Sequence, residues 1–243
     1  MNDKSIPKII HYCWFGKNEK PEIVIKCIKS WEKVLYDYKI IEWNENNFDI
    51  NSNIYVKQAY KNKMFAFVSD YVRIKVLYDY GGIYLDTDVE VLKTFDDLLE
   101  NELFWGFEEG NYIATSTIGS KKKNKIISEF IDLYKDESLI DEYGRVIKTT
   151  NVSMITKLLE SKGVKMNGKY QQVDGMTIYP REVFSPYDYS NCRNFMTKDT
   201  YCIHHFYKSW MSFPQRIKSS IKYNIAKIIG GDNLAKIRKI INN

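Results

Sequence analysis

Hydrophobic runs and amphipathic stretches alternate along most of this chain. Residues 8–15 form a short apolar run rich in β-forming residues directly after Pro7, which predicts a buried first strand. Apolar side chains then recur at helical spacing from Pro21 to about Val34, and a second run near Tyr38–Trp43 predicts another strand. The chain is therefore expected to open as a β-α-β unit.

The same alternation continues towards the C-terminus. Residues 55–61 have a weaker helical pattern, whereas Phe65–Tyr80 is strongly helical and ends at two glycines, which are a helix stop signal. A strand at Ile83–Leu85 follows and runs into Asp86. Further strands are predicted at Leu103–Phe107, Ile113–Ile118 and Tyr201–Phe206, helices at Asn124–Tyr134 and from Asn151 to Gly163, and a loop-rich segment from Met176 to about Tyr189. Strands that alternate with helices predict an α/β fold with a mostly parallel sheet.

Composition supports one globular body with an appendage. The chain has 243 residues, of which 44% are hydrophobic and 15% aromatic, and these fractions exclude a disordered chain. We expect one domain over residues 1–213 and a tail over residues 214–243. No apolar run reaches the roughly 20 residues that span a bilayer and no signal peptide is evident, so a cytoplasmic protein is expected. The four cysteines form no CxxC pair, which argues against a disulfide framework or a cysteine zinc site.

The positive charge of the chain belongs to the tail. The net charge is +5, but residues 214–243 hold seven basic residues against Asp232, so the rest is close to neutral and a nucleic-acid partner is not expected. Residues 214–229 and 232–241 have the pattern of two helices, with an isoleucine stripe on the first. This pattern predicts either docking on an anionic surface, such as the inner face of the plasma membrane, or packing of the stripe on the protein's own domain.

The segment GGIYLDTDVE, residues 81–90, places two carboxylates directly after an apolar strand. Asp86 and Asp88 are two residues apart, so on a strand they point the same way and offer hard oxygen ligands suited to Mg²⁺ or Mn²⁺ bound with substrate phosphates. In an open α/β sheet, ligands bind at the C-terminal ends of the strands. A solvated acidic turn is the alternative.

Two further groups could complete such a site. Ser69, Asp70 and Arg73 share one face of the preceding helix, where Arg73 either binds ligand hydroxyls and phosphates or simply pairs with Asp70. Near the C-terminus, His204 and His205 follow an apolar strand. Because side chains alternate along a strand, at most one of these histidines reaches a metal held by the aspartates, and the other packs or hydrogen-bonds.

Four segments, PKIIHYCWFG, SDYVR, GGIYLDTDV and IHHFYKSW, resemble in this order and at these separations the DXD-containing sugar transferases of glycosyltransferase family 32. That family includes bacterial capsule and lipooligosaccharide sugar transferases and yeast mannosyltransferases, and it is related to the glucosylating bacterial toxins. The resemblance covers about residues 6–213. It implies a GT-A fold with a Rossmann-like, mixed and mostly parallel sheet, a divalent metal (Mn²⁺ or Mg²⁺), and retention of the anomeric configuration. It also implies a nucleotide-sugar donor, expected to be a UDP-sugar, and a glycan or lipid-linked glycan acceptor.

The resemblance also implies roles for individual residues. The implied donor contacts are Cys13 and Trp14 at the uracil ring, Asn46 at the nucleoside, Ser69, Asp70 and Arg73 at the ribose and donor sugar, Tyr84 beside the nucleotide, and Trp210 over the phosphates. The implied metal ligands are Asp86, Asp88 and His205, although the related toxins use residues near Ser209–Trp210 in the third place. Residues 113–119 and 149–154 depart from the family pattern where acceptor contacts are expected, so the acceptor is not implied.

At the place where the resemblance would put a nucleophile, no free carboxylate is evident, and the resemblance therefore implies a front-face route in which the leaving phosphate helps to deprotonate the acceptor. Two other functions explain part of the sequence. A haloacid-dehalogenase-type phosphatase also carries DxD after a strand, but it needs Thr or Val four residues after the first Asp, where this chain has Glu90. A non-catalytic module that binds a membrane surface would explain the tail and leave the acidic pair and SDYVR unexplained.

Overall fold

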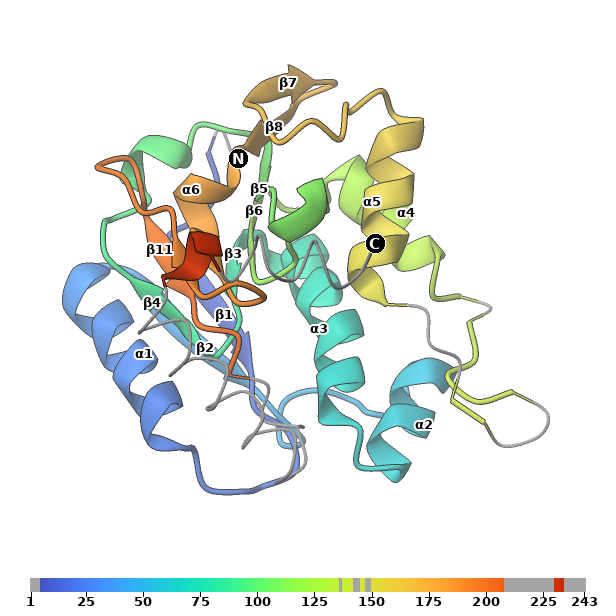
Figure 1. The fold of residues 1–243 in the computed structure, drawn as a ribbon. Coiled ribbons are helices and arrows are strands. Elements are labelled where there is room, and N and C mark those ends of the chain that lie inside the picture. The colour runs from blue at the N-terminus through green and yellow to red at the C-terminus, as the bar shows by residue number, and fades with distance from the viewer. Residues whose placement is uncertain (1–4, 136, 142–144, 147–149, 208–229, 234–243) are drawn as a thin grey trace.

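The computed structural model describes residues 5–135, 137–141, 145–146, 150–207 and 230–233 (Figure 1). The helices predicted for the tail, its membrane docking and the role of Trp210 therefore lie outside the described residues, apart from a helical turn at residues 231–233. Within the part of the chain that is described, no helix is long and apolar enough to cross a membrane.

A seven-stranded sheet forms the centre of the molecule, in the order β2-β1-β3-β6-β5-β8-β7. Strands β2, β1, β3, β5 and β8 run in one direction, while β6 and β7 run antiparallel to their neighbours. The strands are β1 (Ile9–Cys13), β2 (Lys39–Trp43), β3 (Gly82–Leu85), β5 (Leu103–Gly106), β6 (Thr117–Ser120), β7 (Gln171–Val173) and β8 (Met176–Tyr179). The mixed, mostly parallel sheet predicted from the sequence is confirmed.

Helices cover both faces of this sheet. Figure 1 shows α1 on one side and α3, α4 and α5 on the other. The helices are α1 (Glu22–Val34), α2 (Ile54–Lys61), α3 (Phe65–Tyr80), α4 (Lys125–Asp132), α5 (Asn151–Ser161) and the short α6 (Arg181–Phe184). Small antiparallel pairs join β4 (Val89–Val91) to β11 (Cys202–His204), and β9 (Tyr187–Asp188) to β10 (Arg193–Asn194).

Two predicted boundaries are wrong. The segment from Met176 to Tyr189, predicted to be loop, contains β8, α6 and β9. Strand β8 is only four residues long and lies between Gly175 and Pro180, which are turn signals in the sequence. It forms a strand because it pairs with the neighbouring β5. The strand predicted at Ile113–Ile118 begins only at Thr117, because Ile113 forms an isolated bridge with Phe107 instead.

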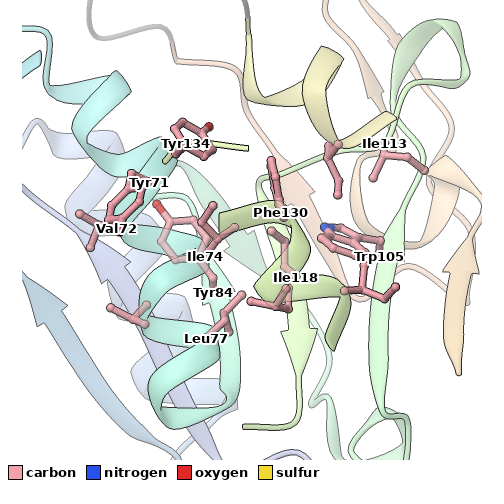
Figure 2. Packing of buried hydrophobic residues seen from close by; sticks show 14 of the residues in the cluster. Tyr71, Val72, Ile74, Leu77, Tyr84, Trp105, Ile113, Ile118, Phe130 and Tyr134 are labelled. Atoms are coloured by element: carbon pink, nitrogen blue, oxygen red, sulfur yellow. The ribbon is translucent and has the colours of Figure 1, made fainter. Parts of the chain in front are cut away.

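Successive side chains of the central strands point to opposite faces of the sheet and belong to two hydrophobic clusters, one on each face. Cys13 and Tyr84 pack with the α3 side, whereas their neighbours Tyr12 and Ile83 pack with the α1 side. Figure 2 shows the α3 side, with labelled side chains Tyr71, Val72, Ile74, Leu77, Tyr84, Trp105, Ile113, Ile118, Phe130 and Tyr134. Both faces of these strands are apolar, which is why they appear in the sequence as continuous hydrophobic runs.

Two glycines make the sharp change from α3 to β3 possible. Gly81 has a φ of +67°, and a Cβ there would lie 2.7 Å from the backbone nitrogen of Lys122. Gly82 has a φ of +108°, and a Cβ there would lie 2.6 Å from the carbonyl oxygen of Ile9. Only glycine fits both the dihedral angles and the close approach. The pair thus fixes where β3 begins and where its C-terminal aspartates emerge.

His11 is a buried histidine in β1 and carries a pH-dependent part of the stability. Its Nδ1 accepts from Trp43 Nε1 at 3.0 Å and its Nε2 donates to the Gly81 carbonyl at 2.8 Å, so the neutral ring is fully used. Burial lowers the pKa of His11 to about 4.

We expect acidification to lower the free energy of unfolding through His11. Between pH 6.5 and pH 4 the unfolded chain binds a proton at His11 that the folded protein excludes. Stability from this group is therefore complete above pH 6.5 and falls by up to about 3 kcal/mol at pH 4. Urea unfolding of wild type and His11→Gln across this range checks it, since only the difference between the two belongs to His11. Parallel curves for the two proteins would contradict the prediction.

Candidate active site

The C-terminal ends of β1, β3, β5 and β8 meet at one edge of the sheet. Trp14 follows β1 at this edge and Asp86 follows β3. Glu108 lies two residues beyond β5 and Arg181 two residues beyond β8. Strand β6 runs the opposite way, so Ser116, the residue before it, reaches the same edge. This is the edge at which open α/β sheets bind ligands.

Asp86, Asp88 and His204 form a cluster of potential metal ligands at this edge. One ligand atom from each lies within 4.8 Å of the others. The Asp86 amide donates to the Ser116 carbonyl at 2.8 Å, which holds the aspartate beside β6. Asp88 lies in the turn between β3 and β4, and β11 brings His204 opposite Val89 of β4. The cluster thus joins residues more than a hundred positions apart in the sequence.

His204, and not His205, is the histidine beside the aspartates. His204 Nε2 lies 3.4 Å from Asp88 Oδ1, whereas His205 Nε2 lies 2.9 Å from Glu90 Oε2. Alternation along the chain after Ile203 sends the two rings to different sides, as the sequence predicts, but the register of β11 on β4 selects the other ring. His205, expected as the third ligand, thus pairs with an acid outside the cluster, and His204 is the histidine beside Asp88.

The cluster has a strongly negative character. Burial alone would raise the pKa of Asp88, but the charge and hydrogen bond of His204 and the Tyr207 N–H lower it to about 2. The Tyr207 amide donates to Asp88 Oδ2 at 2.7 Å. Burial lowers the pKa of His204, yet Asp88 and Asp86 raise it above its ordinary value overall. The same negative charge that holds a proton on His204 would attract a divalent cation.

A buried arginine ties the acidic cluster to α3. Arg73 Nη2 donates to Asp70 Oδ1 at 3.0 Å, and Nη1 donates to the Thr115 carbonyl at 2.7 Å. Nη1 also lies 3.3 Å from Asp86 Oδ1. Burial lowers the pKa of Arg73, but Asp86, Tyr84 and Asp70 raise it above its ordinary value. Burial raises the pKa of Asp70 to about 6 although Arg73 opposes this. Arg73 is therefore held in its charged form, whereas burial makes Asp70 easier to protonate than an exposed aspartate.

Asn151 belongs to this network and was not found from the sequence. Its Nδ2 donates to Asp70 Oδ1 at 2.7 Å and to Thr115 Oγ1 at 3.1 Å. Asn151 is the first residue of α5, and its sequence context shows only the Thr150 cap that begins the helix. Nothing local links it to Asp70, which is 81 residues away. Thr115, in the segment where acceptor contacts are expected, accepts from Arg73 with its carbonyl.

The residues expected around the donor are only partly brought together. Tyr84 donates to Asp86 Oδ1 at 3.1 Å and lies under the Arg73 guanidinium, 4.9 Å from ring centroid to Cζ. Ser69 donates to the Phe65 carbonyl within α3, while its own carbonyl accepts from Arg73. Tyr84, Ser69 and Arg73 thus form one network of hydrogen bonds and ion pairs with Asp70 and Asp86.

The residues expected at the nucleobase lie at the ends of β1 and β2. Cys13 is buried at the end of β1, and burial raises the pKa of its thiol to about 12, so it is not a nucleophile. Trp14 is partly exposed, and its Nε1 donates to the Asn18 carbonyl at 2.8 Å. Asn46 lies on the exposed loop after β2, where its amide donates to Asn44 Oδ1. The backbone and Trp14, more than the Cys13 side chain, are available to a base.

Glu108 is a carboxylate at this edge that the sequence did not bring out. Burial raises its pKa to about 7 although the charges of His204 and Arg181 oppose this, and the charge of Asp86 adds to the rise. Glu108 thus adds a carboxylate within electrostatic reach of Asp86 and His204. Glu108 directly follows a predicted strand, so the rule that singled out Asp86 could have found it as well.

Comparisons with known proteins agree with this arrangement. Residues 21–105 match the family described as glycosyltransferase sugar-binding region containing DXD motif. The chain is 30% identical over 131 residues to inositol phosphoceramide mannosyltransferase 3 of Schizosaccharomyces pombe, covering 52% of this chain and 36% of that protein. It is 24% identical over 223 residues to an uncharacterized glycosyltransferase of Acanthamoeba polyphaga mimivirus, covering 84% of each. The chain thus spans about a third of the yeast protein and most of the viral one.

A solved structure shares the fold. The PaToxG glycosyltransferase superposes with a TM-score of 0.50 at 19% identity, over 65% of this chain and 69% of that one. The phosphatase and binding-module interpretations do not account for these matches. Residues 21–105 therefore match the sugar-binding region of DXD-containing glycosyltransferases, and the chain has the GT-A fold.

Proposed function

We propose that this protein is a retaining, metal-dependent glycosyltransferase. It transfers a hexose or N-acetylhexosamine from a UDP-sugar to a glycan or lipid-linked glycan acceptor in surface-polysaccharide synthesis. The observation that carries this proposal is the meeting of Asp86, Asp88 and His204 beside the buried Asp70–Arg73 pair. The name of the S. pombe relative contains a lipid, inositol phosphoceramide, which supports a lipid-linked acceptor as one class to test.

The residues of the cluster fit a divalent cation. Two carboxylates and one imidazole offer ligand atoms close enough to share one ion, and their charge already raises the pKa of His204. Carboxylate oxygens suit Mg²⁺ and Mn²⁺. When bound by Asp86, Asp88 and His204, the metal would supply Lewis-acid charge for the diphosphate that leaves the sugar.

The Arg73 network would orient the donor sugar. The carbonyls of Ser69 and Thr115 and the carboxylate of Asp70 fix the guanidinium before any ligand binds. Fixed dipoles need no reorganisation during the reaction, which is how a preorganised site lowers a barrier. Asp70 and Asp86 keep oxygens that can accept from sugar hydroxyls. The sugar is thus held with its anomeric carbon near the metal cluster.

Retention follows from a front-face displacement. The acceptor hydroxyl attacks the anomeric carbon on the face from which the diphosphate departs. The bond from that carbon to the diphosphate oxygen breaks, and its electron pair leaves with the diphosphate. The acceptor proton passes to an oxygen of the leaving phosphate. The product has a new glycosidic bond of unchanged configuration.

A donor screen tests the proposal without knowledge of the acceptor. Slow hydrolysis of a panel of UDP- and GDP-sugars is measured with Mn²⁺, with Mg²⁺ and with EDTA. We expect metal-dependent release of UDP from one or a few UDP-sugars. Selective hydrolysis of GDP-sugars would move the proposal to another donor class, and metal-dependent cleavage of p-nitrophenyl phosphate alone would replace it with a phosphatase.

His204 and His205 should separate cleanly in metal binding. His204→Ala removes a group of the acidic cluster, so we expect its apparent affinity for Mn²⁺ in donor hydrolysis to fall at least about tenfold. His205→Ala is the matched control, since His205 contacts Glu90 outside the cluster. A Mn²⁺ titration of both variants checks this. Equal losses, or a larger loss for His205→Ala, would return the third ligand to His205.

Trp14→Ala is expected to weaken UDP binding by about 1–3 kcal/mol, the range for stacking of an aromatic ring on a base. Trp14 is partly exposed at the sheet edge and is therefore accessible to a base. Calorimetric titration with UDP measures the loss. Tyr36→Ala is the control, because Tyr36 is 84% exposed and precedes β2, at the opposite end of the strands. Unchanged UDP affinity in Trp14→Ala would assign Trp14 to packing alone.

A further inference from the structure

Glu108 and Arg181 are neighbours because β5 and β8 are neighbours. The two strands run parallel, with Gly106 opposite Tyr179, and the Phe107 amide donates to the Tyr179 carbonyl at 2.9 Å. Each strand then continues by two residues, to Glu108 and to Arg181 respectively. The charge of Arg181 acts on Glu108, and so do those of His204 and Asp86. Arg181 and the residues of the acidic cluster therefore both lie within electrostatic reach of Glu108.

Arg181 has an unsatisfied guanidinium. Its Nε and Nη2 are buried and have no hydrogen-bond partner, and no ion pair of Arg181 occurs among the described residues. The Arg181 Cζ lies 4.8 Å from the centroid of the Phe195 ring, so the ring supports the plane of the guanidinium. Arg181 as a whole is partly exposed, but buried N–H donors are nearly always hydrogen-bonded, because an unpaired donor costs free energy. The Arg181 guanidinium is therefore suited to an anionic ligand.

Arg193 provides an internal contrast on the same ring. Its Cζ lies 4.9 Å from the Phe195 centroid, but its Nη2 and Nε are 2.8 and 2.9 Å from Asp188 Oδ2. One arginine at Phe195 thus has a carboxylate partner and the other does not. The Nε and Nη2 atoms that lack partners in Arg181 form the edge of the guanidinium that binds a carboxylate or a phosphate with two parallel hydrogen bonds.

We propose that Arg181 binds an anionic group, a phosphate or a carboxylate, carried by the acceptor, and that the enzyme therefore prefers anionic acceptors. This inference rests on the proposed function. The donor side lies at β1 and β3, where Trp14 and Asp86 emerge, whereas β6 and β5 separate β8 from β3. An anion bound at Arg181 would therefore lie at the β5–β8 side of the sheet edge. The donor would occupy the β1–β3 side, so the β5–β8 side is open to the acceptor.

Phosphate binding tests the inference without any transfer reaction. The full chain, saturated with UDP and Mg²⁺, is unfolded thermally in inorganic phosphate and in chloride of equal ionic strength. At about ten times its Kd, phosphate should raise the melting temperature of wild type by roughly 3–6 °C. Arg181→Met should lose this rise and Arg181→Lys should keep part of it. Arg193→Met should keep all of it, because Arg193 already has Asp188.

Acceptor preference provides the second readout. Wild type is offered glucose 1-phosphate and 4-nitrophenyl glucuronide, which are anionic, and 4-nitrophenyl glucoside, which is neutral, and kcat/KM is compared. We expect at least about a tenfold preference for one of the anionic acceptors, which is what one charge-assisted hydrogen bond can supply. Arg181→Met should abolish that preference through KM of the acceptor. The phosphate and carboxylate acceptors show which anion is recognised.

Each contrary result has a definite meaning. A phosphate effect that disappears when UDP is bound would place Arg181 at the donor diphosphate and overturn the inference, as would a weakened Kd for UDP in Arg181→Met. No phosphate effect on wild type would also overturn it. Should Arg181→Met fail to fold, the competition between phosphate and UDP on wild type decides. A protein that binds phosphate at Arg181 but transfers no sugar would refute the proposed function and leave this site standing.

Discussion

Asp88→Asn is expected to lower sugar transfer and donor hydrolysis at least about 10²-fold while the protein stays folded. The amide keeps the shape of the side chain, and its oxygen can still accept from the Tyr207 amide. It loses the negative charge that raises the pKa of His204 and that a divalent cation requires. Removal of one group that stabilises charge in the transition state has an effect of this size.

Glu90→Gln is the matched control for that variant. Glu90 lies two residues further along and contacts His205 and Lys26 rather than the cluster. It should retain nearly full activity. Rates are measured at saturating donor over a range of Mn²⁺ concentrations, and thermal unfolding verifies the fold. Full wild-type activity in EDTA, or in Asp88→Asn, would remove the metal from the mechanism.

Arg73→Met should destabilise the fold strongly, with a loss of about 3–5 kcal/mol in the free energy of unfolding, because removal of one partner of a buried ion pair has this cost. The substitution leaves Asp70 as a buried carboxylate without its charge partner and removes the donor from the Thr115 carbonyl. Transfer should fall at least about 10²-fold as well, since the guanidinium orients the sugar.

The double variant Arg73→Met, Asp70→Asn separates structure from catalysis. The neutral amide should restore much of the stability but none of the activity. The loss in Arg73→Met should also shrink at low pH. Without Arg73 the pKa of Asp70 rises above its present value of about 6, and protonation then removes the unpaired charge. Urea unfolding at pH 5 and pH 8 measures this. Recovery of activity in the double variant would reduce the pair to a structural role.

The sequence predicts best what a single segment decides. The apolar run, the glycine pair and the aspartates after β3 are adjacent, so position and orientation of the acidic pair follow from local rules. His204 and His205 differ by one residue, and only the pairing of β11 with β4 decides which ring faces Asp88. A one-residue change of register exchanges the two faces, and no local signal specifies it.

Strand order decides the rest of the site. Asn151 at the start of α5 reaches Asp70 on α3, and Arg181 lies near Glu108 because β8 lies beside β5. Both pairs join segments that lie far apart in the sequence, 81 residues in the case of Asn151 and Asp70. Hydrophobic periodicity does not predict such long-range contacts. Arg181 was further hidden because Pro180 and a four-residue strand made its segment look like loop. Only the three-dimensional structure shows that the Arg181 Nε and Nη2 lack hydrogen-bond partners.

The cluster of Asp86, Asp88 and His204 is completed by β11, the last described strand in the chain. A chain growing from its N-terminus displays Asp86 and Asp88 from the moment β3 is made, but the imidazole arrives only when residues 202–204 add to β4. A nascent or prematurely ended polypeptide therefore cannot assemble the full ligand set. Under the proposed function, polypeptides that stop short of β11 should therefore lack metal-dependent donor hydrolysis.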